Sequence, residues 1–489
     1  MESKIDENKN KVGLLFGDVG TTNLQMTVTG SVEEGEFVKI FHENAGWILG
    51  VIEYLERKTD LSIDKALLLN AGVDVKIQDV LIGEINIIGY RDNNKILQRP
   101  KTPFKAGEPV YIADDDLIRE TLGLGEKKEH SAYIGLLHNH EIPIYLDINS
   151  LVQKHISILA KTGGGKSYFT GILVEELLKN NVTTIIIDPH GEYYSLSIPA
   201  EKNASMERFK VEPRSYKDKI ILFSIFNKNK EYNNIKFTLA QFSPRDILTM
   251  LDSNDRIYFN MLRNAMERAK AKNKLFELSD VINELQKEED SMTATVLINQ
   301  LKSLESLNIF ANEGTKISDI VKKGKASIID LKGVPPKVQE MLVSRLSYSL
   351  FELRKRNEIP PLILILEEAH NYIPQQGKSL SSDILRTIAS EGRKFGLGLG
   401  IISQRPAKVD KNVLSQCNTQ IILKITNPND LKTIGESVEG LTKHSLDDIQ
   451  RLPIGVALVT NPDLSFPLFV DIRPRETKHG GEGVNVTDN

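Results

Sequence analysis

The chain has 489 residues, of which 40% are hydrophobic and 26% charged, and its 62 Lys and Arg against 66 Asp and Glu leave a net charge of −4. This composition excludes a short disulfide-stapled peptide and a wholly disordered chain, and the length predicts about three domains. The single cysteine, Cys417, excludes an intrachain disulfide and a thiolate metal cluster. Nucleic-acid binding stays open, because phosphate attraction depends on where positive side chains cluster.

The sequence also lacks the signals of membrane insertion and secretion. No apolar run approaches the roughly 20 residues that a membrane-spanning helix needs. The chain begins MESKIDENKNK, which is charged where a secretory leader turns apolar. We therefore expect a cytoplasmic protein that makes no contact with a membrane.

The N-terminal part predicts a β-barrel, which we place at residues 1–145. Short runs such as VGLLFGDVG, NLQMTVTG and INIIGY alternate apolar with polar residues and are separated by Gly, Asn and Asp. This alternation is typical of strands with one buried face. The segment around Trp47, HENAGWILGVIEYLERKTD, has helical spacing instead, and we expect a helix there that covers one end of the barrel.

The remainder predicts a doubly wound α/β domain. Short β-branched runs, each followed by a helix-compatible segment, include HISILA, TTIIID, IILFSI, ASIIDL, LILILEE, LGIISQ, TQIILKI and GVALVT. Such runs are typical of parallel strands that are buried on both faces. We expect this core at 146–242 and 316–473, interrupted by a helical insertion at 243–315. The polar, glycine-rich residues 474–489 predict a flexible tail, or one ordered only by a neighbour.

The residues after the HISIL run form a phosphate-binding loop. Glycine N–H groups and a helix N-terminus bind phosphate, Lys166 reaches the β- and γ-phosphates, and Ser167 can ligate Mg²⁺. The predicted ATP-binding residues are Thr162, Gly163, Gly164, Gly165, Lys166, Ser167 and Tyr168. Ala160 stands where the pattern usually has its first glycine, which is compatible with the loop if Ala160 keeps a negative φ.

Carboxylates follow two other predicted strands. LILIL ends in Glu367 and Glu368, and adjacent side chains at a strand end point in different directions. We assign Glu367 to the magnesium shell and Glu368 to activation of a water beside the γ-phosphate. Asp188, after TTIII, has two interpretations: with Glu192 it positions the metal-bound water or a neighbouring subunit, or it caps the turn through Pro189. On the first interpretation, we include Asp188 with Ser167 and Glu367 in the predicted magnesium site.

Three polar residues near the strand LGIIS complete the predicted machinery. Gln404 ends that strand and can sense the γ-phosphate by hydrogen bonding. Arg393 ends the preceding helix, and its planar fork of donors suits stabilisation of transferred charge in the site of an adjoining subunit. Arg405 is an alternative for this role, or it only holds its loop in place.

Taken together, these residues resemble the archaeal HerA helicases and translocases, relatives of the FtsK-type DNA pumps, over nearly the whole chain. The matching segments are PKTPFKAGEPVYIA, KHISILAKTGGGKS, IIIDPHGEY, LILILEEAHNYIP and EGRKFGLGLGIISQRP. The resemblance implies a homohexameric ring, a barrel like that of ATP synthase subunits, a RecA-like motor and ATP sites at subunit interfaces. It also implies double-stranded DNA in the channel and a NurA-type nuclease docked on the barrels, for DNA end resection in double-strand break repair.

By motif, the resemblance makes Lys166 and Ser167 nucleotide-binding, Glu368 catalytic, Arg393 the finger in trans and Gln404 the sensor. Two other functions fit the same residues. One is a conjugation or secretion ATPase, and the other is a nucleotide-gated scaffold with little hydrolysis. For DNA contacts we expect lysines and arginines between Phe209 and Lys230.

Overall fold

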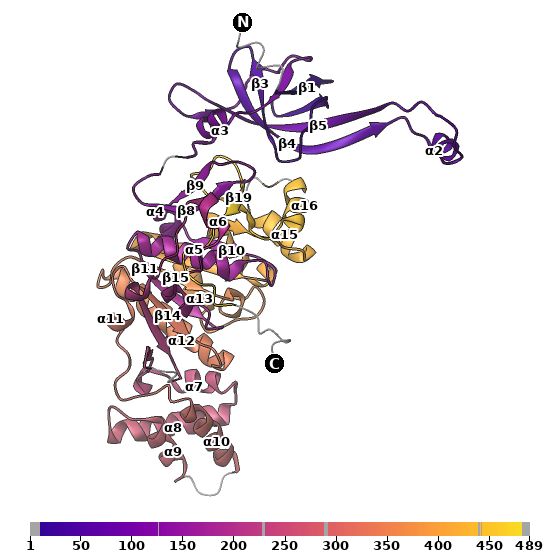
Figure 1. Cartoon of the computed structure of the whole chain (residues 1–489). Helices are drawn as coiled ribbons and strands as arrows, with labels where there is room; N and C mark the ends of the chain where they lie inside the picture. The colour runs from indigo at the N-terminus through magenta and orange to yellow at the C-terminus, as the bar shows by residue number, and fades with distance from the viewer. Residues whose placement is uncertain are drawn as a thin grey trace.

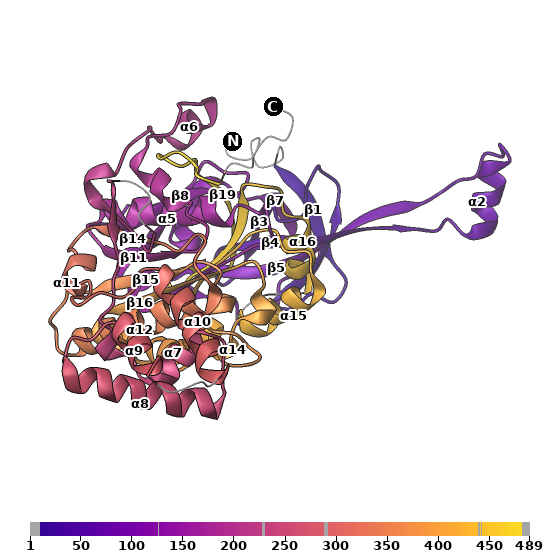
Figure 2. The same ribbon diagram turned by 90° about the horizontal axis from the view of Figure 1, so that it is seen from below.

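The computed structural model describes residues 10–125, 127–226, 230–287, 292–438, 441 and 443–481. In Figure 1, a barrel lies at one end of the molecule, a large sheet flanked by helices lies in the middle, and a helical block lies at the other end. A long two-stranded arm leaves the barrel sideways (Figures 1 and 2).

The N-terminal domain is a six-stranded antiparallel barrel. Its strands are β1 (Lys11–Phe16), β2 (Asn23–Val28), β3 (Phe37–His42), β4 (Gly46–Thr59), β5 (Asp79–Arg91) and β7 (Pro109–Ile112), and the short β6 (Leu97–Gln98) pairs antiparallel with the end of β5. They follow the order β2-β1-β7-β3-β4-β5, and a β2–β5 pairing closes the barrel. Fully buried Val38, Ile40, Ile48 and Ile52 fill its interior. The predicted barrel is confirmed.

The helix expected around Trp47 is wrong, because this segment forms β4. Ile48 and Ile52 have the spacing of a helix face, yet β4 pairs with β3 on one side and β5 on the other. Pairing with two neighbours therefore overrode the local pattern. Beyond Tyr54 the strands β4 and β5 form the arm, and its tip carries α2 (Ile63–Asn70), which has no buried residue.

The second domain is built on a twelve-stranded mixed sheet. Its strands are β8 (Ser131–Leu137), β9 (Pro143–Asp147), β10 (Ile156–Leu159), β11 (Thr183–Asp188), β12 (Ile220–Ser224), β13 (Tyr232–Asn234), β14 (Ala326–Asp330), β15 (Leu362–Leu366), β16 (Leu397–Ser403), β17 (Thr419–Ile422), β18 (Val456–Thr460) and β19 (Leu468–Ile472). Their order is β13-β12-β14-β11-β15-β16-β10-β17-β18-β19-β8-β9. The strands from β13 to β17 run parallel, and the rest of the sheet is antiparallel.

Helices cover both faces of this sheet. They are α4 (Ile148–Gln153), α5 (Lys166–Lys179), α6 (Ala204–Phe209), α11 (Ile317–Ile320), α12 (Pro336–Lys355), α13 (Ser382–Phe395), α14 (Lys411–Gln416), α15 (Pro428–Ser437) and α16 (Lys443–Arg451), and α3 (Asp115–Leu122) joins the barrel to the sheet. Short 3₁₀ turns are η1 (Tyr193–Ser197), η2 (Lys217–Lys219), η3 (Leu239–Gln241), η4 (Ala369–Asn371) and η5 (Pro406–Lys408). Along β15, Leu362, Leu364 and Leu366 belong to one core, and Ile363 and Ile365 to the other. The predicted doubly wound α/β fold is confirmed.

The helical insertion forms the end of the molecule opposite the barrel (Figure 1). It consists of α7 (Pro244–Met250), α8 (Arg256–Lys272), α9 (Leu278–Leu285) and α10 (Met292–Ser306), inside the predicted range of 243–315. Apolar residues of these helices share one core with the central sheet, so the block is anchored on the motor domain rather than tethered to it.

Other predicted boundaries differ from the structure. We placed residues 131–145 in the barrel, but β8 pairs with β19 and so belongs to the central sheet. The run Val456–Thr460, grouped with the parallel strands, is antiparallel to β17. A tail was expected from Pro474 onward, but residues 474–477 are buried, because they pack against α5. Residues 482–489 lie outside the described part of the chain.

Candidate nucleotide-binding site

The phosphate-binding loop connects β10 to α5 at the carboxyl edge of the parallel strands. Gly163 has φ +73° and Gly165 has φ +93°, a backbone conformation that favours glycine. A Cβ atom at Gly163 would meet nothing within 4 Å, so the loop surrounds open space. Ala160 is fully buried and is not among the residues with positive φ, which meets the condition set for it from the sequence.

Glu367 and Glu368 follow β15 directly and lie beside the loop. Lys166 Nζ lies 2.7 Å from Glu367 Oε1 and 2.7 Å from Glu368 Oε1. The carboxyl groups are 1% and 5% exposed, so Lys166 contacts both inside the protein, away from solvent. Glu368 also has φ +52°, a conformation that is uncommon for a residue with a Cβ and that recurs at functional sites.

The protonation state of Glu368 follows from its neighbours. Burial raises the pKa of this carboxyl, but His190 and positively charged Lys166 outweigh burial and lower the pKa to about 2. His370 Nδ1 lies 3.3 Å from Glu368 Oε2. Glu368 is therefore ionised at neutral pH and can accept a hydrogen bond from a water molecule in the cleft.

Glu367 has two hydroxyl partners in addition to Lys166. Its Oε1 accepts a hydrogen bond from Ser167 Oγ at 3.4 Å, and its Oε2 accepts one from the hydroxyl of the fully buried Tyr193. A hydroxyl and a carboxylate beside a lysine are oxygen ligands of the kind that Mg²⁺ prefers. Ser167 and Glu367 thus fit a magnesium ion.

Asp188 is engaged in a turn. Its Oδ1 accepts hydrogen bonds from the amides of His190 and Gly191, and its Oδ2 accepts one from the amide of Tyr193. Burial raises the pKa of Asp188 to about 7, against the effect of these amides. The geometry favours the turn-capping interpretation, and its place in the magnesium set stays a prediction.

Gln404, at the end of β16, contacts the loop directly. Thr162 Oγ1 donates a hydrogen bond of 2.5 Å to Gln404 Oε1. The Gln404 amide therefore connects the phosphate-binding loop to the end of β16 through Thr162. Gln404, Lys166 and Glu368 line one cleft of about 940 Å³, and Glu367 contacts Lys166 without lining the cleft itself.

Arg393 lies elsewhere. It is in the last turn of α13, before β16 begins, whereas Gln404 follows the far end of β16, whose seven residues span about 23 Å. Its side chain is exposed and makes no hydrogen bond or ion pair with any described residue. By contrast, Arg386 on the same helix binds the buried Asp410 at 2.7 Å. Arg393 therefore does not reach the cleft of its own chain.

With this geometry in place, comparisons with known proteins identify the family. Residues 132–350 match the family described as "Helicase HerA, central domain". A "Probable DNA double-strand break repair helicase HerA" of Methanocaldococcus jannaschii is 29% identical, over 96% of this chain and 97% of the relative. The "DNA double-strand break repair helicase HerA" of Pyrococcus furiosus is 26% identical, over 98% and 96%. The chain belongs to the HerA helicase family.

A solved structure agrees with this fold. VirB4 of Thermoanaerobacter pseudethanolicus matches with a TM-score of 0.50 and 15% identity, over 71% of this HerA-family chain and 98% of VirB4. At this identity the likeness establishes the α/β fold and nothing of the activity. In the described residues of this HerA-family protein, no helix combines the length and apolar character of a membrane span.

The sequence analysis missed several residues in and around this candidate nucleotide-binding site. Tyr193, which holds Glu367, and His190, which lies 3.8 Å from Glu368, both follow Asp188 in the segment DPHGEY. The density of polar residues after a buried strand was the available signal. His479 lines the same cleft, but its position in a polar, glycine-rich segment gave no signal.

Proposed function

We propose that this protein hydrolyses ATP to move double-stranded DNA, as a ring-shaped hexamer that works with a NurA-type nuclease in end resection for double-strand break repair. The observation that carries the proposal is the position of Lys166, 2.7 Å from each of two buried carboxylates beside an open phosphate-binding loop. Membership of the HerA helicase family supports DNA as the substrate, and the relatives are named as double-strand break repair helicases.

In this proposal different residues of the site bind phosphate, hold the metal ion and activate water. The amides of Gly163–Lys166 and the Lys166 ammonium bind the phosphates of ATP, which releases Lys166 from the carboxylates. Ser167 and Glu367 hold Mg²⁺, which supplies positive charge next to the β- and γ-phosphates when bound. Glu368, ionised and held in a strained backbone conformation, orients and polarises the attacking water.

The exposed Arg393 supports a ring. A group that stabilises transferred charge is needed near the γ-phosphate, and Arg393 does not reach the cleft of its own chain. A head-to-tail interface would bring Arg393 of one subunit to the cleft of the next, and such an interface generates a ring when the rotation between subunits closes. Gln404, bonded to Thr162, passes the loss of the γ-phosphate to β16, so that two subunits shift against each other.

DNA binding in the channel would use backbone phosphates and so show little sequence preference and a steep salt dependence. Of the lysines and arginines expected to contact DNA, Lys219 donates hydrogen bonds to Leu178 O and Asn181 Oδ1 and is used within the chain. Lys210 is exposed, and Lys228 lies outside the described residues.

Steady-state ATPase activity with and without linear duplex DNA tests the proposal. We expect Mg²⁺-dependent hydrolysis that duplex DNA stimulates and that Lys166→Ala abolishes. Hydrolysis that DNA leaves unchanged would favour the nucleotide-gated scaffold, and stimulation by single-stranded DNA alone would favour a conjugation-type motor. Duplex stimulation in rings of six, seen in particle images, would support the full proposal.

A further inference from the structure

Part of the cleft lining is apolar or aromatic, and the proposed function gives these side chains no role. Its phosphate end is formed by residues 161–167. The same lining also includes the apolar or aromatic side chains of Tyr168, Phe209, Leu423, Ile472, Pro474 and His479. A cleft of about 940 Å³ is within the range that binds small molecules, and a surface of this kind suits a flat heteroaromatic ring.

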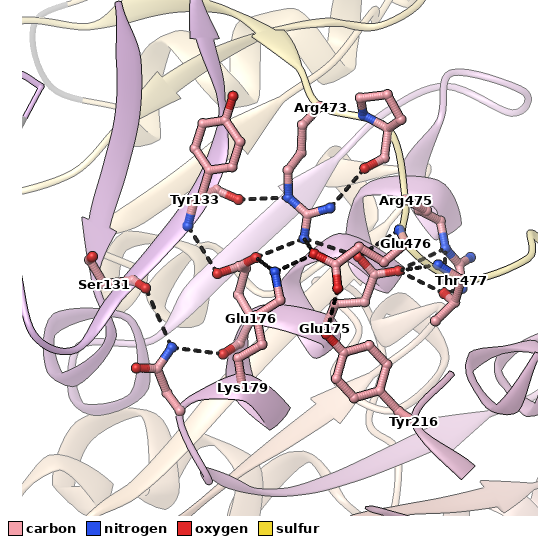
Figure 3. Close-up of polar contacts among 12 residues, drawn as sticks. Ser131, Tyr133, Glu175, Glu176, Lys179, Tyr216, Arg473, Arg475, Glu476 and Thr477 are labelled. Carbon is pink, nitrogen blue, oxygen red and sulfur yellow. Dashed lines mark hydrogen bonds and ion pairs between the residues drawn. The ribbon is translucent and has the colours of Figure 1, made fainter. Parts of the chain in front are cut away.

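Two of these side chains come from the C-terminal segment, which we define as residues 473–481. The segment crosses the phosphate-loop helix α5, as Figure 3 shows for its first half. Tyr168, Gly171 and Glu175 lie on one side of α5, at spacings of three and four residues. All three lie against this segment, so the helix that follows the phosphate-binding loop also positions the part of the cleft wall that the segment provides.

The segment is fixed by buried charges. Arg473 is fully buried and donates to Glu175 Oε2 at 3.0 Å, to Glu176 Oε1 at 2.8 Å and to the carbonyl of Tyr133 at 2.9 Å. Glu175 in turn accepts hydrogen bonds from the amide and hydroxyl of Thr477 at 2.9 and 2.7 Å. Because buried carboxylates need partners, this arrangement holds the segment against α5 (Figure 3).

Gly171 shows that the crossing requires space in the helix. A Cβ atom built at Gly171 would overlap the guanidinium of Arg475, which is 3% exposed. Glycine in a helix interior weakens the helix, so its presence here is explained by the close approach of Arg475. The amide of Arg475 also donates a 3.0 Å hydrogen bond to the Tyr168 hydroxyl.

Near its end, the C-terminal segment contributes His479 to an aromatic pair in the cleft. The rings of Tyr168 and His479 lie with centroids 5.6 Å apart and an interplanar angle of 67°. Arg475 Nη1 lies 3.3 Å from His479 Nδ1 and so orients the imidazole ring. Tyr168 directly follows Ser167, and both rings are partly exposed toward the cleft. The pair therefore forms an aromatic corner next to the phosphate end.

We propose that this corner, Tyr168 with His479, binds the nucleobase of the nucleotide whose phosphates the loop residues Thr162–Ser167 hold. The inference rests on the proposed function, because it names a second end for the same ligand. The base packs against the two rings and against Pro474 and Ile472, which are part of the same wall. The C-terminal segment is thus part of the ATP site of its own chain.

Equilibrium binding to the full-length protein tests this. Base stacking on an aromatic side chain is worth about tenfold in affinity, so His479→Ala should raise the Kd for ATP about tenfold. His479→Phe keeps an aromatic ring and should restore most of the affinity. Lys478→Ala is the matched control, because Lys478 is exposed and does not line the cleft.

Inorganic tripolyphosphate separates base binding from a structural effect. It carries the phosphates without the base, so its Kd should be the same for wild type and His479→Ala. An unchanged Kd for ATP in His479→Ala would overturn the inference, as would equal weakening of ATP and tripolyphosphate.

Lys166→Ala distinguishes this inference from the proposed function. If Lys166→Ala retains ATP binding and hydrolysis, the proposed function fails. If Lys166→Ala loses them while His479→Ala binds ATP like wild type, only the base-binding corner fails.

Discussion

Charged side chains are buried and paired at one edge of the central sheet and exposed at the other. At the carboxyl edge, Lys166, Glu367 and Glu368 are largely buried, and Lys166 forms an ion pair with each glutamate. At the other edge, the guanidinium of Arg393 is exposed and has no partner among the described residues. Under the proposed function, one chain carries two halves of a reaction site that do not meet within it, one half to bind ATP and orient water, the other to neutralise charge.

Removing the carboxylate that orients water should have the largest effect. Glu368→Gln keeps the shape of the side chain but lowers its capacity to polarise water, and we expect kcat to fall about 10³-fold. ATP binding should persist, because Lys166 and the loop are intact. ATPase assays together with calorimetric titration check this, and a variant that still hydrolyses at the wild-type rate would move the catalytic role elsewhere.

At the opposite edge, Arg393→Ala should lower kcat at least 10²-fold and leave the Kd for ATP nearly unchanged, since an arginine finger acts on the transition state. Lys394→Ala, which removes a neighbouring exposed cation from the same helix end, is the control and should behave like wild type. Equal losses in both variants would show a general electrostatic effect.

The lowered pKa of Glu368 makes the free energy of unfolding depend on pH in the acid range. A carboxyl with a folded pKa of about 2 stays ionised when the unfolded chain takes up a proton near pH 4.3, so its stabilising effect is present above pH 4.3 and is lost as pH falls toward 2. Denaturation of wild type and Glu368→Gln should show the wild-type advantage shrinking by about 2 kcal/mol between pH 7 and pH 3. A constant difference would mean that Glu368 has an ordinary pKa.

The smallest effect is expected at the link between the edges. Gln404→Ala removes the acceptor for Thr162, and we expect kcat to fall about tenfold with little change in ATP affinity. Arg405→Ala is the comparison, because Arg405 is the adjacent exposed residue and the alternative finger. If Arg405→Ala has the larger effect, the finger is Arg405 instead of Arg393.

The sequence predicted the features that depend on contiguous residues. The phosphate loop and the pair Glu367–Glu368 are set by the strand before them and by the need for glycine, and both lie where they were expected. Features that depend on distant pairing were missed. The segment of Trp47 became β4 through pairing with two other strands, and residues 131–145 left the barrel because β8 pairs with β19.

The C-terminal segment was missed for a related reason. Its polar composition predicts a solvated tail, but the buried Glu175 and Glu176 on α5, together with the carbonyl of Tyr133, give Arg473 partners inside the protein. In the sequence, Glu175 and Glu176 resemble ordinary exposed residues of a helix. Neither these glutamates nor Arg473 alone therefore indicated that they pair.

Complementation between two inactive variants tests the split site most directly. ATPase activity is measured for Glu368→Gln, for Arg393→Ala, and for an equimolar mixture after subunit exchange. In the mixture about a quarter of the interfaces unite an intact Glu368 with an intact Arg393 from the neighbour, so the account predicts activity well above the sum of the separate variants. A mixture no more active than that sum, with exchange demonstrated, would contradict it.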